Sequence, residues 1–164
     1  MANYDYSLGT AGSGLYKVAI KNEHFVRKHV INFADVLATK GSALAAGDTV
    51  DVLALFPGER VVDVTARVIT AATAASTVTV GDQANATSYI TSVACDGAAG
   101  TLTGGNGANF FTQSGVTPFA VTWVGGKFYT AANTIRITLG ATAPQAGVIE
   151  FCAYIEEVGT DVAL

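Results

Sequence analysis

Hydrophobic and polar residues alternate with a period of two along several separate stretches of this chain. Between residues 62 and 68, small apolar residues occupy the even positions and polar or charged residues the odd ones. Residues 133–139 alternate in the same way, and in residues 147–158 the pattern places Glu150 and Glu156 on the outer face, toward solvent or an interface. Because successive side chains of a β-strand point to opposite faces, this period indicates strands with one buried face. Antiparallel sheets commonly have that arrangement, so the chain is predicted to be all-β.

Turn residues divide the chain into many short strands. Pro57-Gly58 ends the β-rich run 49–56, and Gly81-Asp82 ends the run 76–80. One short helix is expected, over residues 33–39. About eight to ten strands with this punctuation predict an antiparallel sandwich or a jelly-roll-like barrel with a flexible N-terminal arm.

Two pairs of neighbouring strand patterns are expected to form hairpins. Residues 60–70 and 76–80 are separated by a turn of small residues. Residues 119–124 and 127–130 are a second such pair.

The length of 164 residues suits a single domain with terminal arms. Residues 1–14 are polar and Gly-rich, which is typical of a flexible arm. We assign residues 1–40 to an N-terminal arm and anchoring segment, and residues 41–164 to the β-domain. Within that domain, residues 83–126 hold a single charged residue, Asp96, and we interpret them as a charge-poor insert.

Charged residues are scarce: they make up 13% of the chain, against about a quarter of an ordinary soluble domain. Either some faces are buried in an assembly, or uncharged Thr, Ser, Asn and Gly cover much of the surface. The net charge of -4 argues against a nucleic-acid partner, which would usually require a basic face. No apolar run approaches the ~18 residues that span a bilayer, so no membrane partner is predicted.

The residues that carry chemistry are few and dispersed. His24 and His29 lie five positions apart, so on a strand they point to opposite faces, and no GxSxG motif is present. Cys95 and Cys152 lack CxxC spacing and are interpreted as inert thiols, with a disulfide between them as the alternative. No catalytic residue, cofactor or metal site is predicted, and the chain is not expected to be an enzyme. A hydrolase whose carboxylates meet only in the folded chain stays an alternative.

Two segments are candidate contacts with other proteins. The first is cationic, and a cationic segment behind a flexible arm can dock on an acidic partner through charge complementarity. The second lies in the charge-poor insert and contains aromatic residues with no charged residue nearby. This composition is typical of the centre of a protein interface. The candidate contact residues are Lys17, Lys21, Arg27 and Lys28 in the first segment, and Phe110 and Phe111 in the second.

Several of these segments resemble small structural proteins of tailed bacteriophages. In residues 56–64 a Pro-Gly turn precedes a Val-rich strand, and residues 76–82 form a second strand that ends in Val-Gly-Asp. The closing strands, residues 133–139 and 147–157, are similar to the same group. The resemblance covers about the last two-thirds of the chain.

The resemblance implies a capsid decoration (cement) protein or a related virion structural protein. Its expected partner is the major capsid protein, and it is expected to form a homo-oligomer, with a trimer favoured. After synthesis in the host cytoplasm, it is expected to lie on the outer surface of the virion. The alternative is a carbohydrate- or receptor-binding β-sandwich of a phage fibre or tail. Its signature would be an exposed aromatic cluster, for which the candidates are Phe110, Phe111, Trp123, Phe128 and Tyr129.

Overall fold

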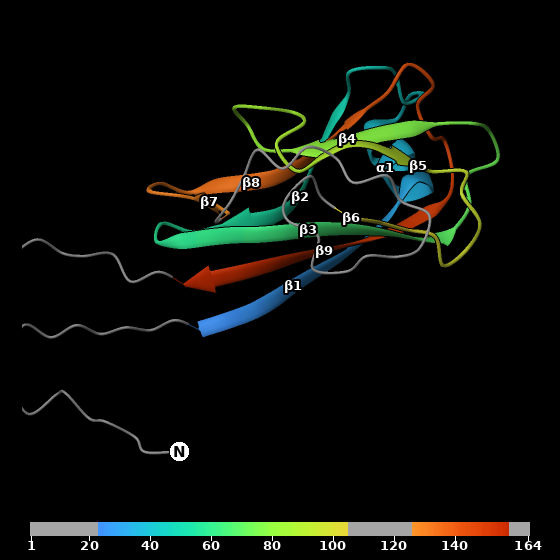
Figure 1. Ribbon diagram of the computed structural model, residues 1–164. Helices are drawn as coiled ribbons and strands as arrows, with labels where there is room; N and C mark the ends of the chain where they lie inside the picture. The colour runs from blue at the N-terminus through green and yellow to red at the C-terminus, as the bar shows by residue number, and fades with distance from the viewer. Residues whose placement is uncertain (1–22, 105–125, 158–164) are drawn as a thin grey trace, which may run out of the picture.

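The computed structural model describes residues 23–104 and 126–157 (Figure 1). These residues form nine strands and one short helix, and the strands build two antiparallel sheets that pack face to face. The predicted all-β sandwich is confirmed, and the strand count of the described residues falls within the expected range.

Sheet A contains five strands in the order β1-β9-β3-β6, and β7 also pairs with β3. Every pairing in this sheet is antiparallel. The two short strands β6 and β7 lie along the same edge of β3, at its opposite ends. The bounds are β1 Glu23–Asn32, β9 Val148–Glu157, β3 Glu59–Thr70, β6 Leu102–Gly104 and β7 Lys127–Phe128.

Sheet B contains four strands in the order β2-β8-β4-β5, again all antiparallel. Within the described residues, β1 and β2 are edge strands, each with a single pairing partner. They lie on the same side of the sandwich. The bounds are β2 Thr49–Leu55, β8 Asn133–Leu139, β4 Thr77–Gly81 and β5 Ile90–Ala94.

The predicted hairpin of residues 60–70 with 76–80 is wrong, because β3 lies in sheet A and β4 in sheet B. Both strands have one apolar face, and each buries it by packing across the sandwich instead of pairing side by side. The connection between the sheets is fixed by two backbone hydrogen bonds, from Ala72 N–H to the Cys95 carbonyl (2.8 Å) and from Cys95 N–H to the Ser76 carbonyl (2.8 Å). In the second predicted hairpin, residues 119–124 lie outside the described residues, and β7 pairs with β3.

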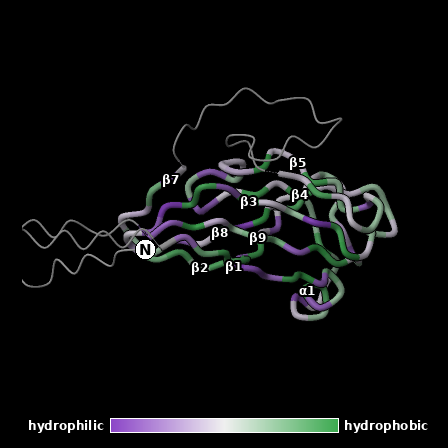
Figure 2. Tube along the Cα trace, turned by 60° about the horizontal axis from the view of Figure 1, so that its bottom comes forward, coloured by the Kyte–Doolittle hydropathy of each residue, from purple (hydrophilic) through white to green (hydrophobic). Residues whose placement is uncertain are grey.

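The core lies between the sheets and follows the period of two seen in the sequence. Figure 2 shows hydrophobic and hydrophilic residues alternating along the strands. One detail differs from the pattern: the register of β3 shifts between Val61 and Asp63, so Val61 is buried and Val62 only half-buried. A bulge of this kind moves one residue out of the alternation. The largest fully buried side chains are Phe33, Leu55, Ile135, Ile137, Ile149, Phe151 and Ile155.

The one helix of the described residues, α1 (Phe33–Lys40), matches the prediction within a residue. The side chain of Asn32 caps its first turn by accepting a hydrogen bond from Ala34 N–H (3.1 Å). Gly41 ends it with a φ of 71° and donates its N–H to the Leu37 carbonyl (3.0 Å). Left-handed backbone of this kind favours glycine, which explains why the helix stops there.

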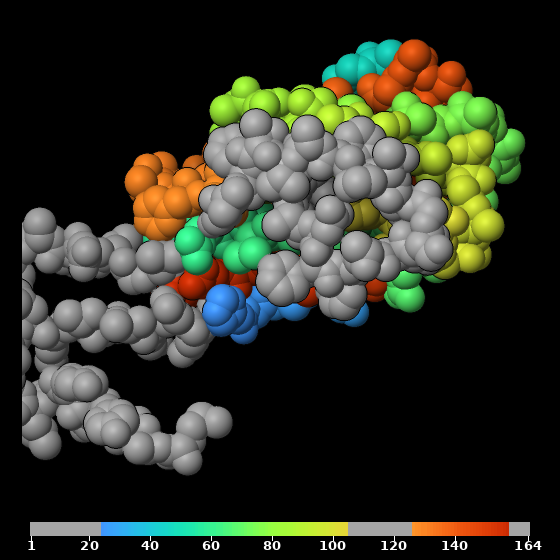
Figure 3. Space-filling view, in the orientation of Figure 1, coloured from blue at the N-terminus to red at the C-terminus, as the bar shows by residue number. Residues whose placement is uncertain are grey.

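The two ends of the sandwich differ. At one end, Glu157 of β9 pairs with Glu23 of β1 on one side and with Glu59 of β3 on the other. We call this end the terminal pole, because residues 22 and 158 attach there. The opposite end holds α1 (Figure 1) and the loops 41–48 and 140–147, which lie together in Figure 3 and are joined by two hydrogen bonds between Gln145 and the Leu44 backbone.

Candidate protein-contact site

The structure describes two of the six predicted contact residues, Arg27 and Lys28, and both lie in β1. Lys17, Lys21, Phe110 and Phe111 lie outside the described residues. Residues 23–32, which the sequence assigned to the anchoring segment, form an integral strand of sheet A. The side chain of Lys28 is 61% exposed on the outer face of that sheet, with its Nζ atom 3.8 Å from a Glu150 carboxylate oxygen, so it is accessible to a partner.

Arg27 is engaged within the chain. Its guanidinium donates from Nη1 to Glu59 Oε2 (2.7 Å) and from Nη2 to Glu59 Oε1 (2.5 Å), and Nη1 also reaches the Ala54 carbonyl (2.7 Å). The same group lies over the rings of Phe25 and Phe56, 5.0 Å and 4.9 Å from their centroids. Arg27 therefore joins the edge strand of sheet A to the end of β2 in sheet B.

Glu59 is the buried partner in this contact, with 5% of its surface exposed. Its Oε2 atom also accepts a hydrogen bond from Phe56 N–H (2.8 Å), which fixes the turn between β2 and β3. A bidentate pair between arginine and a carboxylate is among the stronger polar contacts in proteins. The contact closes the open side of the sandwich at the terminal pole.

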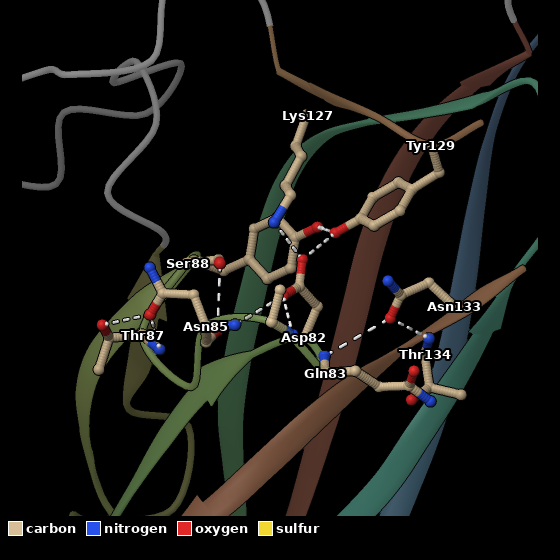
Figure 4. A network of polar contacts seen from close by, with 11 residues as sticks. Asp82, Gln83, Asn85, Thr87, Ser88, Lys127, Tyr129, Asn133 and Thr134 are labelled. Carbon is tan, nitrogen blue, oxygen red and sulfur yellow. Dashed lines mark hydrogen bonds and ion pairs between the residues drawn. The ribbon is translucent and has the colours of Figure 1, made fainter. Parts of the chain in front are cut away.

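A second polar network surrounds Asp82, whose side chain is fully buried just after β4 (Figure 4). Its Oδ2 atom accepts hydrogen bonds from the Tyr129 hydroxyl (2.6 Å) and from Lys127 Nζ. Its Oδ1 atom accepts from the backbone N–H groups of Ala84 (3.0 Å) and Asn85 (2.9 Å). The network thus ties the loop after β4 to the chain at β7.

These contacts set the ionisation of the groups involved. Burial alone would raise the pKa of Asp82, but the hydrogen bonds from Lys127 and Tyr129 and the charge of Lys127 hold that pKa below its usual range. Burial, followed by the hydrogen bond to Asp82, raises the pKa of Tyr129 well above its ordinary value. Burial likewise raises the pKa of Tyr89, which hydrogen-bonds Tyr129. Asp82 is therefore a carboxylate at neutral pH, and both tyrosines are neutral.

The loop after Asp82 is fixed by its own side chains and by a lack of space. Asn85 Oδ1 accepts hydrogen bonds from the N–H and the hydroxyl of Thr87 (both 3.0 Å). A Cβ atom on Gly81 would lie 2.0 Å from the Asn85 carbonyl oxygen, so only glycine fits at that position. The sequence indicated a turn at Gly81-Asp82, but the partner Lys127 is 45 residues further along the chain.

A third ion pair lies at the same pole. Arg60 Nε donates to Glu156 Oε2 (2.8 Å), and Glu156 is 6% exposed. Val61, next to Arg60, pairs with Lys127 in the register of β3 and β7, so the ion pairs of Arg60 and Lys127 lie close together. The terminal pole is thus held by three ion pairs with buried carboxylates, where residues 22 and 158 attach.

A groove of about 830 Å³ lies at the other end, between β1, α1 and the start of β2. Two of its carboxylates are paired with cations. The hydrogen bond from Lys40 lowers the pKa of Asp48, and the hydrogen bond from Arg136 lowers that of Asp51. A general acid would need a raised pKa, which neither carboxylate has.

Other chemistry is sparse in the described part of the chain. No three His, Cys, Asp or Glu side chains there are grouped closely enough to hold a metal ion. Cys95 and Cys152 are free thiols, so the alternative of a disulfide between them is not observed, and burial raises the pKa of Cys95 to about 11. Within residues 23–104 and 126–157, which the structure describes, no helix is long and apolar enough to cross a membrane.

The aromatic residues proposed for glycan binding do not form one surface where the structure describes them. Tyr129 is 5% exposed and donates its hydroxyl to Asp82, whereas Phe128 is 44% exposed on β7. Phe110, Phe111 and Trp123 lie outside the described residues. The glycan-binding alternative therefore stays a prediction.

Comparison with solved structures finds the same fold in chains of phage capsids. A chain from the acidic stable capsid of Helicobacter pylori bacteriophage KHP30 has 13% identity, a TM-score of 0.50 and coverage of 82% of this chain and 88% of that chain. A chain of the cyanophage Pam1 capsid asymmetric unit has 15% identity and a TM-score of 0.53, with coverage of 95% of this chain and 99% of that chain. A chain of the capsid of Ralstonia phage GP4 has 15% identity and a TM-score of 0.53, with coverage of 85% of this chain and 86% of that chain. No protein-family model and no curated protein sequence matches. The likeness to phage capsid chains predicted from the sequence is confirmed at the level of the fold.

Proposed function

We propose that the chain is a structural protein of a bacteriophage virion that decorates the outer head shell and catalyses no reaction. The observation that carries this proposal is a β-sandwich shared over 82% to 95% of the chain with chains from three phage capsids. The short phage-like motifs of the sequence point to the same class of protein.

The order of the strands supports the proposal. β6 and β7 pair with the same edge of β3, so they can be counted as two ends of one strand. The sheets then have the orders β1-β9-β3-β6/β7 and β2-β8-β4-β5, and the chain crosses repeatedly between them. We infer a double-sheet jelly roll, an architecture that viral capsid and lectin domains use.

The anchor on the shell is proposed to lie at the terminal pole. Residues 1–22 attach there at Glu23 and carry Lys17 and Lys21, and Lys28 is exposed further along β1. Cations on a segment leaving a well-fixed pole can steer it to an acidic patch of the major capsid protein. Each contact can be weak, because a homo-oligomer, for which the resemblance implies a trimer, binds several shell subunits at once.

The test is co-sedimentation of the chain with empty head shells assembled from the major capsid protein of the same phage. We expect the full chain to bind at saturable sites, and a variant lacking residues 1–22 to stay folded without binding, because the deletion ends before β1. Lys17→Glu with Lys21→Glu should weaken binding at least tenfold.

Lys40→Glu is the control, because Lys40 lies in α1, away from the terminal pole. It should bind like the parent chain. A truncated chain that still decorates shells at full occupancy would overturn the anchor, and a full chain that never binds shells would overturn the function.

A further inference from the structure

The outer faces of the two sheets differ in chemistry. Among the described residues, seven large hydrophobic side chains are exposed, and six of them belong to strands of sheet A. Their exposed fractions range from 38% to 48%, and those in β1, β3 and β9 stand on the opposite face from the buried core residues of the same strands. The six are Val26, Val30, Ile69, Leu102, Phe128 and Tyr154.

Sheet B has a different outer surface. Between the buried residues of β8 and β4 stand hydroxyl side chains, and the charged pair Asp51–Arg136 spans β2 and β8. The polar residues on this face include Thr77, Ser92, Thr134 and Thr138. Sheet B therefore exposes hydroxyl side chains and one charged pair, whereas sheet A exposes large apolar side chains between charged ones. A concentration of exposed apolar side chains on one face marks an interaction site.

We propose that the outer face of sheet A is a two-fold contact with a second copy of this chain. The register of the strands across sheet A supports this contact. One row across the sheet reads Val30, Glu150, Arg67, Leu102, that is apolar, acidic, basic, apolar. A second row reads His24, Glu156, Arg60, Phe128, with acid and base in the same central strands.

A two-fold axis parallel to the strands, between two such faces, reverses each row. Val30 of one copy then meets Leu102 of the other, and Glu150 meets Arg67. In the second row the Arg60–Glu156 pair of one copy, in which Arg60 covers the carboxylate, lies against the same pair of the other copy in reverse order. In the first row apolar residues thus face apolar residues and the acid faces a base. In one of the rows between the two, Tyr154 meets Asp63, and in no row do two like charges meet. This is the self-complementarity that an isologous contact requires.

The charges of the face favour a second copy over a strongly charged partner. Three cations (Lys28, Arg60, Arg67) and three anions (Asp63, Glu150, Glu156) lie in the outward rows, and 3 − 3 gives no net charge. Two neutral faces meet without an excess of like charge. A face that binds a strongly acidic or basic partner would instead have an excess of charges of the opposite sign.

The size of the face also fits. β1, β9 and β3 lie side by side over about ten residues, and β6 and β7 add three and two residues along the edge of β3. The flat footprint is then on the order of 550 Å² at ~3.3 Å per residue and ~4.8 Å between strands. Because protruding side chains add to the flat area, the surface that this face can bury approaches the roughly 800 Å² per partner of a standard interface. The inference concerns how copies of this chain associate and does not depend on binding to shells. It replaces the trimer that the resemblance implies with an assembly of an even number of copies.

The test is the solution mass of the full chain by light scattering, in the absence of shells. We expect an even number of copies, because a two-fold contact joins chains in pairs. Val30→Glu alone and Leu102→Lys alone should each weaken association at least tenfold. The double variant Val30→Glu with Leu102→Lys should restore it, because each new glutamate meets a new lysine of the other copy.

Within one chain Val30 and Leu102 stand on opposite edges of the sheet, so a rescue cannot arise inside the monomer. Ser92→Glu, exposed on sheet B, is the control and should leave the mass unchanged. A parent chain that is monomeric or trimeric would overturn the proposal, as would a Val30→Glu variant with unchanged mass. A double variant that is not rescued would overturn the two-fold register.

Discussion

Replacing the buried carboxylate of Asp82 by an amide tests whether the polar network holds the terminal pole. Asp82→Asn keeps the shape of the side chain and one acceptor oxygen for the N–H groups of Ala84 and Asn85. It removes the negative charge that faces Lys127 and the acceptor that binds the Tyr129 hydroxyl. Lys127 is then left without its counter-ion in a site where its side chain is 27% exposed.

The expected loss follows from these contacts. Breaking a buried ion pair by removing one partner costs about 3–5 kcal/mol, and a hydrogen bond to a charged group contributes about 1.5–3 kcal/mol. Because Lys127 retains partial contact with water, we take the lower end, about 3 kcal/mol. For a chain of this size that corresponds to roughly 10 °C in Tm.

The loss should depend on pH in a defined direction. The folded pKa of Asp82 lies below its ordinary value, so its contribution is complete above about pH 4 and is lost as the pH falls toward the folded pKa. The difference in stability between the parent chain and Asp82→Asn should therefore be full at pH 7 and shrink below about pH 4.

The assay is urea unfolding followed by circular dichroism at pH 7 and at several acidic pH values. Asp51→Asn is the matched control, because Asp51 pairs with Arg136 on the outer face of sheet B with half its side chain exposed. It should lose less than about 1 kcal/mol. If Asp82→Asn loses no more than this control, or if its deficit is the same at pH 3 and pH 7, the ion pair of Asp82 with Lys127 does not stabilise the terminal pole.

Four further substitutions or labelling results follow from the packing. Gly81→Ala should cost about 3 kcal/mol or yield no folded chain in an expression and unfolding assay, because its Cβ would meet the Asn85 carbonyl; a Tm within 2 °C of the parent would contradict this. Arg27→Lys should lose about 1–2 kcal/mol in urea unfolding, since an ammonium cannot form the bidentate contact. Phe151→Ala should lose about 3–5 kcal/mol because Phe151 is fully buried, and a loss under 1 kcal/mol would place it outside the core. Thiol labelling at pH 8 should leave Cys95 unmodified until the chain unfolds, because burial raises its pKa to about 11, and rapid labelling of the native chain would contradict that burial.

Local patterns in the sequence predicted most individual elements. The alternation predicted β8 and β9 within a residue, since each strand has one face toward the core, and the β-rich run before Pro57-Gly58 predicted β2 within a residue. The helix over 33–39 was also predicted, and the structure shows that Asn32 and Gly41 cap its two ends. Local pattern could not tell which sheet each strand joins. The sequences of β3 and β4 each place apolar residues on one face, and a strand in either sheet can bury such a face.

The contacts that hold the terminal pole were beyond prediction for a related reason. The partners of each ion pair are far apart in the chain. Arg27 and Glu59 are separated by 32 residues, Asp82 and Lys127 by 45 residues, and Arg60 and Glu156 by 96 residues. The alternation correctly placed Glu156 on the outer face of β9, yet Arg60 covers it and leaves it 6% exposed. Charges scattered along a chain give no signal of pairing until the strand register is known.

The candidate contact residues illustrate the same limit. The cluster of cations near the N-terminus was visible in composition, but Arg27 proved to be engaged with Glu59 whereas its neighbour Lys28 is exposed. Adjacent residues of a strand point to opposite faces, so one strand separates a residue that stabilises the fold from one that is available to a partner.

An image reconstruction of head shells incubated with an excess of the chain tests whether the protein decorates the shell. We expect β-sandwich density on the outer surface of the shell at symmetry-related sites, with the terminal pole toward the shell. Shells that stay bare at saturating concentration would contradict it.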